Sequence, residues 1–172
     1  MSNIFTGRYT AGTDEPFVVF LIGMRFNKWR AVRQWLPVFM AMPKMIRELE
    51  AHPEKGFLGG RLLLEWRGAT NIQYWRSFEA LEQFARNPDD PHLPAWKAFY
   101  KNVKDGSVGF WHETYVVRPG LFETIYNNTP RMGLASVMDH VPATGGRREA
   151  RERLKIGSAV TLEEVKPRIN TN

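Results

Sequence analysis

Apolar and polar positions divide the chain into short elements separated by glycine and proline. Residues 17–24 are apolar and rich in β-branched side chains, which predicts a central strand covered on both faces. Apolar residues then recur at three- and four-residue spacing between Trp29 and Met40, as on one side of a helix. Because proline lacks a backbone N–H, Pro37 is expected to start, kink or split this helix, and Pro43 to restart it.

The middle of the chain predicts a hairpin and two further helical segments. Residues 57–66 and 70–78 have the pattern of strands, and the turn at residues 67–69 joins them. Ser77 is placed to cap a following helix. A proline-rich break at residues 87–91 precedes a second amphipathic segment, up to residue 103.

The last part of the pattern predicts a long strand over residues 107–118 and a short one over residues 121–126. The resulting order is strand, helix, strand, strand, helix, strand. This order predicts an α+β fold, the ferredoxin-like βαββαβ sandwich with an antiparallel sheet and helices on one face. We expect an N-terminal arm over residues 1–15, the sandwich over 16–126, and a C-terminal extension with a basic arm over 127–172.

Both faces of the strand over residues 107–118 carry large side chains. Phe110, His112, Thr114 and Val116 alternate with Trp111, Glu113, Tyr115 and Val117. One helix layer covers one face only, and an open aromatic face is costly in water. The pattern therefore predicts a homodimer in which two sheets pack together as a dimeric α+β barrel.

Composition limits the chemistry. The 172 residues include no Cys, which excludes disulfides, cysteine-bound metals and a thiol nucleophile. There is no nucleotide-binding glycine motif, no Gly-x-Ser-x-Gly and no His-Glu-x-x-His, and no pair of His has the spacing of a helix-borne metal site. We therefore expect no protein-only metal centre.

Charge and targeting signals also restrict the partners. The net charge of +6 permits an acidic partner, but residues 145–155 mix five basic residues with two Glu and have no aromatic side chain for base stacking. We expect neither a nucleic-acid nor a membrane partner. The longest apolar stretch is about half a bilayer span, and no signal peptide is recognised, so a cytoplasmic protein is expected.

Two blocks resemble a known group of proteins. Residues 74–85 (Tyr-Trp-Arg-Ser-Phe-Glu-Ala-Leu-Glu-Gln-Phe-Ala) and 92–99 resemble the second half of antibiotic-biosynthesis-monooxygenase-like domains, which belong to the dimeric α+β barrel superfamily. The stretch Gly-Phe-Trp-His-Glu-Thr-Tyr at 109–115, with residues 122–128, is similar to the monooxygenase-like family named after a fungal fumagillin-pathway oxygenase. The resemblance runs from about residue 16 to residue 154. It implies a small enzyme or binding protein: a cofactor-independent oxygenase, a haem-dependent oxygenase or dehydratase, or a ligand-binding dimer.

His112 is the first candidate catalytic residue. A strand holds its ring among apolar neighbours, where a neutral imidazole can accept a proton from a substrate, ligate haem iron, or fill a structural position. His92 is the alternative haem ligand, because haem-binding members of the superfamily carry their axial His in the helical region before the last strand. The cofactor is thus expected to be none or haem.

Arg76 and a group of aromatic residues complete the candidate site. Arg76 either pairs with Glu65 or Glu113, or stabilises a substrate carboxylate or oxyanion, and Tyr115 can supply a hydroxyl. Aromatic side chains either line a substrate cavity or belong to the core. The candidate substrate-binding residues are Trp66, Tyr74, Trp75, Trp96, Phe110, Trp111 and Glu113. The function expected from these residues is oxidation of a small, mostly apolar organic substrate.

Overall fold

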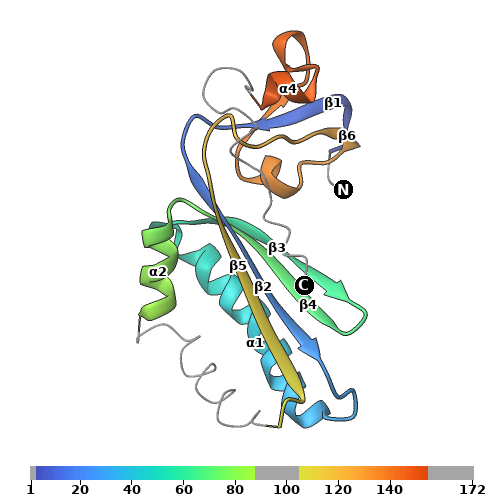
Figure 1. Ribbon diagram of the computed structural model, residues 1–172, viewed down its shortest axis with the longest axis vertical. Coiled ribbons are helices and arrows are strands. Elements are labelled where there is room, and N and C mark those ends of the chain that lie inside the picture. Colours follow the sequence, from blue (N-terminus) through green and yellow to red (C-terminus); the bar gives the residue numbers. More distant parts are fainter. Residues whose placement is uncertain (1–2, 88–104, 155–172) are drawn as a thin grey trace, which may run out of the picture. The chain divides into compact units, whose positions relative to one another are not determined.

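The computed structural model describes residues 3–87 and 105–154. Within them the chain forms two compact units, one of residues 16–117 and one that joins residues 3–15 to residues 118–154. Each unit has its own antiparallel sheet (Figure 1). No helix in the described ranges is long and apolar enough to cross a bilayer.

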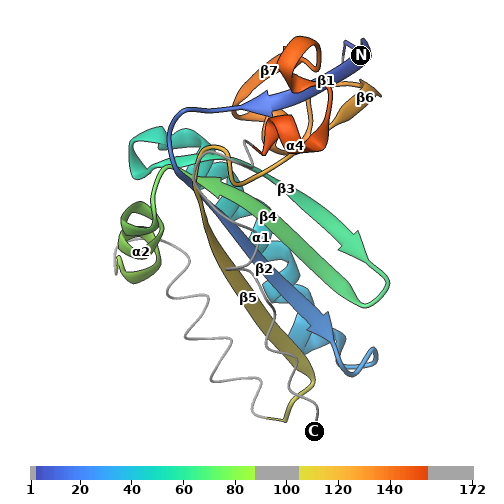
Figure 2. The same cartoon turned by 45° about the horizontal axis from the view of Figure 1, so that its top comes forward.

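The unit of residues 16–117 is built on a four-stranded sheet of order β3-β4-β2-β5. Its strands are β2 (Phe17–Phe26), β3 (Phe57–Glu65), β4 (Gly68–Trp75) and β5 (Val108–Val117). All three pairings are antiparallel, with β2 and β4 in the centre (Figure 2). The ferredoxin-like α+β fold predicted from the sequence is confirmed.

The first helix, α1 (Val32–Ala51), is continuous through both of its prolines. The expectations that Pro37 starts or splits this helix, and that Pro43 restarts it, are therefore wrong. Each proline removes one backbone hydrogen bond, but the helix buries Met42 and Leu49 against the sheet, and this burial offsets the loss. The short 3-10 helix η1 (Pro53–Lys55) follows.

The predicted cap at Ser77 is confirmed. The Ser77 hydroxyl accepts a hydrogen bond from the backbone N–H of Ala80 at 3.2 Å, and α2 (Phe78–Arg86) begins at the next residue. The second amphipathic segment expected before residue 103 lies outside the described residues.

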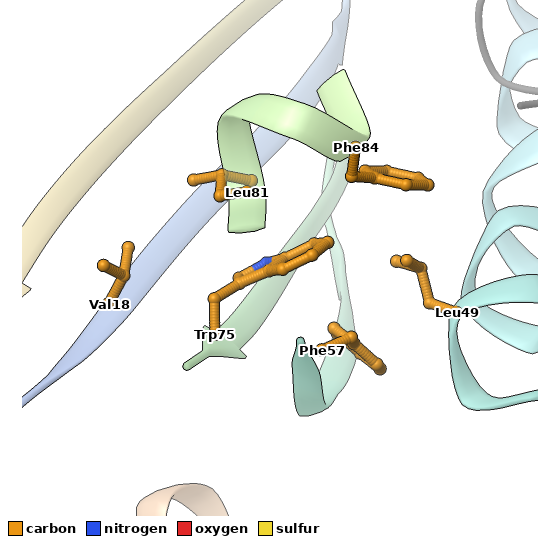
Figure 3. Close-up of a cluster of buried hydrophobic side chains, with 6 residues drawn as sticks. All are labelled: Val18, Leu49, Phe57, Trp75, Leu81 and Phe84. Carbon is orange, nitrogen blue, oxygen red and sulfur yellow. The ribbon is translucent and has the colours of Figure 1, made fainter. Parts of the chain in front are cut away.

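One cluster of buried side chains joins both helices to the sheet. Trp75 on β4 is fully buried, and its ring contacts Phe57 and Phe84, with both pairs of ring centroids 5.4 Å apart (Figure 3). Val18, Leu49 and Leu81 complete the cluster. These contacts identify the face of the sheet that α1 and α2 cover.

The unit of residues 3–15 and 118–154 has a three-stranded sheet of order β6-β1-β7. Its strands are β1 (Phe5–Gly12), β6 (Tyr126–Thr129) and β7 (Asp139–Pro142). The short strand predicted over residues 121–126 is wrong, because β6 begins at Tyr126 and pairs with β1. Two 3-10 helices, η2 (Gly133–Ser136) and η3 (Gly145–Arg147), and the short α4 (Ala150–Arg153) follow.

An inward-facing arginine holds α4. The guanidinium of Arg153 forms an ion pair with Glu123 and donates to the backbone oxygens of Arg147 and Arg148 at 2.8 and 2.7 Å. Its side chain is 7% exposed. Arg153 therefore stabilises this part of the fold through its ion pair and hydrogen bonds, although the sequence analysis places it in a basic arm.

His140 on β7 lies in an aromatic cluster of the same unit. Its ring stacks on Tyr9 with centroids 4.5 Å apart and contacts Phe5 and Tyr126 edge-on. Both ring nitrogens are buried without a hydrogen-bond partner among the described residues. Burial, together with the positive charge of Arg131, lowers the pKa of His140.

We expect this unit to lose stability in mild acid. Because the pKa of His140 in the folded chain lies below the unfolded value of about 6.5, its contribution is complete above that pH and is lost as the pH falls. The folded-to-unfolded ratio should fall by up to about tenfold per pH unit. Chemical unfolding followed between neutral pH and mild acid measures this, and His140→Phe should remove the part of the dependence that lies above the range in which the carboxyl groups titrate. An unchanged dependence in His140→Phe would contradict it.

Candidate functional site

A row of four side chains crosses the helix-covered face of the sheet. Strand register pairs Asn71 with Leu62 on one side and with Ile22 on the other, and Ile22 pairs in turn with His112. Side chains that pair directly across strands point to the same face. Asn71 and His112 are therefore two strand spacings apart on one face, about 10 Å between Cα atoms.

The carboxamide of Asn71 is the unusual group in this row. Asn71 is 0% exposed, and neither its side-chain oxygen nor its side-chain nitrogen has a hydrogen-bond partner in the described part of the chain. Leaving a buried polar group unsatisfied costs about 1–3 kcal/mol. A side chain of this kind is suited to contact a polar atom of a ligand, since it offers two N–H donors and one oxygen acceptor.

A second row of paired residues, which contains Gln73, lies next to the row of Asn71 on the same face of the sheet. Gln73 pairs with Phe20 on β2 and Gly60 on β3. Its side-chain oxygen accepts a hydrogen bond from the indole N–H of Trp75 at 2.9 Å, so this amide is used within the fold. A Cβ atom at Gly60 would lie 2.7 Å from the backbone oxygen of Ile72, too close for a side chain, and 3.5 Å from Oδ1 of Asn71, which is ordinary contact.

His112 lies at the other end of the row, on the edge strand β5. Its ring centroid is 5.7 Å from that of Phe20, at an interplanar angle of 43°. The side chain is exposed, and no described residue hydrogen-bonds to its ring nitrogens. The imidazole is therefore available to a ligand on the same face as Asn71.

Several other predicted site residues lie on the opposite face of the sheet. Alternation along β5 places Trp111, Glu113 and Tyr115 there, away from His112. The Tyr115 hydroxyl donates to a carboxylate oxygen of Glu113 at 2.5 Å, and this bond raises the pKa of Tyr115. The ring of Trp111 lies over Gly23, where a Cβ atom would be 2.3 Å from it. The structure thus does not bring Tyr115 and His112 together.

Arg76 follows the end of β4 and is exposed. Its guanidinium donates to the backbone oxygen of Pro53 at 3.4 Å. The described residues show no ion pair of Arg76 with Glu65 or Glu113; Glu65 accepts a hydrogen bond from Thr70, and Glu113 accepts one from Tyr115. Arg76 therefore lies apart from the row that contains Asn71.

The predicted aromatic residues have different surroundings. Trp75 is core, Phe110 packs against the second buried cluster on the helix side, and Tyr74 is buried on the opposite face. Trp66 is 86% exposed in the β3–β4 turn, so it lines no enclosed space. His92 and Trp96 lie outside the described residues.

Sequence reasoning missed Asn71, although a signal was present. Alternation from Trp75 backwards places Gln73 and Asn71 on the face of the buried tryptophan. Two amides on the inner face of a central strand are costly unless they have partners. Gln73 has such a partner in Trp75, whereas Asn71 has none within the described part of the chain.

Within the described ranges, no group of three or more His, Asp or Glu side chains is placed to hold a metal ion. If the protein holds haem, His112 is the one imidazole of the row that would bind its iron. The chemistry that the row itself offers is an amide donor and acceptor beside a proton acceptor.

Comparison with known proteins identifies the family of the chain. The family model described as Monooxygenase af470-like matches residues 17–134. Monooxygenase af470 of Aspergillus fumigatus is 31% identical, over 74% of this chain and 53% of that protein. The chain thus spans about half the length of this curated relative.

Among solved structures, a crystal structure of an aldoxime dehydratase in complex with butyraldoxime has a TM-score of 0.64 at 16% identity, covering 77% of this chain and 40% of that one. SnoaB, a cofactor-independent oxygenase from Streptomyces nogalater, has a TM-score of 0.41 at 20% identity, covering 59% of this chain and 93% of its own. At such identities the aldoxime dehydratase likeness supports the fold alone.

The four-stranded sheet and its two helices define an α+β protein of the ferredoxin-like class. The chain belongs to the monooxygenase af470-like family, whose model covers more than half of it. The family resemblance recognised in the sequence is confirmed.

Proposed function

We propose that this protein is a monooxygenase that oxidises a small, mostly apolar organic molecule on the helix-covered face of its sheet. Family membership supports the reaction class. The observation that carries the proposal is the buried carboxamide of Asn71, without a partner among the described residues, in one row with His112. A substrate oxygen bonded to Asn71 would bring an adjacent C–H bond toward the imidazole.

The proposed reaction needs only the substrate and O2. His112 removes a proton from a methylene group that a neighbouring aromatic or carbonyl system acidifies. The carbanion gives one electron to O2, and the two radicals combine to form a C–O bond; protonation of the distal oxygen gives a hydroperoxide whose carbon keeps one hydrogen. Loss of water then converts this carbon to a carbonyl group, so one oxygen atom enters the product and the other leaves as water.

Asn71 is proposed to stabilise the negative charge that develops on the substrate oxygen. An amide N–H in a buried site is effective because its dipole is already oriented and water does not compete. This assigns to Asn71 the role that the sequence offers to Arg76 or Tyr115. Ile22 lies between Asn71 and His112 on β2, and Phe20 lies on the same face of that strand. Both would contact the apolar part of the substrate.

O2 uptake with a panel of phenolic and terpenoid compounds that contain an activated methylene group tests the proposal. We expect His112→Ala to lower turnover by about a hundredfold or more, because general-base catalysis contributes about 10²–10⁴-fold. His52→Ala is the matched control, since His52 forms only surface pairs with Glu48 and Glu54.

An absorption spectrum of protein from cells supplied with a haem precursor separates the two cofactor alternatives. The proposal expects turnover without a Soret band. A Soret band that His112→Ala abolishes would instead support a haem enzyme of the same fold. Unchanged turnover in folded His112→Ala protein would overturn the base assignment.

We further propose that two copies pair through the sheet face opposite α1 and α2. That face carries Trp111 and Tyr115, which are 39% and 48% exposed, together with half-buried Val19, Leu21 and Ile72. Burial of such a patch favours association. Light scattering at micromolar concentration should give twice the chain mass of 19.9 kDa; a monomer at this concentration would contradict the pairing.

A further inference from the structure

An exposed apolar surface lies on the same unit, along α1 and at the β3–β4 turn. We call it the α1 patch, and its members are Trp29, Val32, Leu36, Met40, Leu64 and Trp66. All six are exposed, Leu64 at 72% and Trp66 at 86%. Contiguous apolar surface of this kind is rare on soluble proteins unless it contacts a partner.

Two parts of the chain build the patch. Val32, Leu36 and Met40 follow one another at four-residue intervals along α1, so they form one line on its outer side. Trp29, in the loop before α1, contacts Trp66 of the β3–β4 turn edge-on, with ring centroids 6.1 Å apart. The loop and the turn lie at the same end of the sheet (Figure 2).

Positive charge predominates along the α1 part of the patch, whereas the exposed Glu65 lies between Leu64 and Trp66 at the β3–β4 turn. Residues 16–47 contain six basic residues and no Asp or Glu, so this stretch alone carries as much charge as the whole chain, which has a net charge of +6. Arg30 and Arg33 are exposed beside the patch, and Lys44 and Arg47 follow Met40 on the outer side of α1. Lys28 is already paired with Asp105.

We propose that the α1 patch docks the protein on the surface of an anionic phospholipid membrane. Tryptophan rings and aliphatic side chains enter the boundary between headgroups and acyl chains, while a rim of Arg and Lys binds lipid phosphates and carboxylates. A second copy is disfavoured as the occupant, because two such rims would repel each other. Nucleic acid is disfavoured because Val, Leu and Met offer it no hydrogen bonds.

This inference is independent of the proposed reaction, and it differs from the sequence-based expectation of no membrane partner. That expectation rests on the basic residues near the C-terminus, where Glu149 and Glu152 alternate with the arginines. Counting charges by segment instead shows that residues 16–47, which contain Trp29, Val32, Leu36 and Met40, carry charge of one sign.

Sedimentation of the full chain with lipid vesicles tests the proposal. We expect binding to phosphatidylcholine vesicles containing about 30% phosphatidylserine, weak binding to phosphatidylcholine alone, and weaker binding at high salt. Tryptophan emission should shift to shorter wavelength on binding. Since each basic residue near an anionic surface contributes about fivefold to partitioning, Arg30→Ser with Arg33→Ser should weaken binding about 25-fold.

Matched variants elsewhere in the chain provide controls. Arg147→Ser with Arg151→Ser removes the same charge from the C-terminal arm, and Leu121→Ser removes another half-exposed leucine, so both should leave vesicle binding unchanged. Trp66→Ser and Leu36→Ser should each weaken it several-fold. Equal binding to neutral and anionic vesicles, or full binding by Arg30→Ser with Arg33→Ser, would overturn the proposal. Loss of a dimer instead of vesicle binding in the Trp66 and Leu36 variants would assign the patch to a second copy.

Discussion

Replacing Trp75 by alanine is expected to lower the free energy of unfolding by about 3–5 kcal/mol. The indole is fully buried at the centre of the cluster that joins β2, β4, α1 and α2. Its loss leaves a cavity between Phe57 and Phe84 and removes the donor to the Gln73 oxygen, which then remains buried without a partner. Denaturant unfolding followed by circular dichroism measures the change.

Trp66 provides the control for this prediction, because the same substitution removes a tryptophan that is 86% exposed. Trp66→Ala should change the free energy of unfolding by less than about 0.5 kcal/mol. A similar loss in both variants would mean that the cluster around Trp75 is not the core of this unit. Trp75→Phe should have an intermediate effect, since it keeps most of the packing but still leaves Gln73 without its donor.

Replacing Asn71 by leucine is expected to separate activity from stability. Leucine has a similar size and no polar atoms, so it removes the cost of the unpartnered carboxamide, and the stability should stay equal or rise by about 1–2 kcal/mol. Turnover should fall by about a hundredfold, the effect of losing one oriented donor to a developing oxyanion. Steady-state O2 uptake and unfolding of the same preparations measure both quantities.

A different result for Asn71→Leu would contradict a role of this side chain in turnover. If the carboxamide were a structural group, the variant would be less stable, and its activity per folded molecule would be unchanged. Asn71→Asp adds a second comparison, because a carboxylate accepts hydrogen bonds but cannot donate when ionised. It should therefore lose turnover as Asn71→Leu does.

The sequence was sufficient for elements whose pattern is local. The apolar run of β2, the alternation in β5, the hairpin of β3 and β4, and the serine cap of α2 follow from side chains that are neighbours in the chain. It was insufficient for β1, β6 and β7, because two of these strands have only four residues and their pairing joins segments more than a hundred residues apart. The continuity of α1 also depends on distant packing, which outweighs the intrinsic effect of its prolines.

The candidate site was predicted in part. His112 was recognised because a histidine within an apolar strand needs an explanation. Asn71 was not recognised, because its importance depends on the absence of a hydrogen-bond partner. Only the folded chain reveals that Gln73 has a partner and that no described residue bonds to the side chain of Asn71. Likewise, alternation separates Tyr115 from His112, but only the hydrogen bond to Glu113 reveals what its hydroxyl does.

A double-mutant cycle on Asn71 and His112 tests most directly whether these residues form one site. Turnover is measured for the unmodified chain, Asn71→Leu, His112→Phe and the double variant, with the folded fraction determined for each. Groups that act on the same substrate molecule are strongly non-additive, so the double variant should be about as slow as the slower single variant. A loss equal to the product of the two single losses would contradict a shared site on the inner face of the sheet.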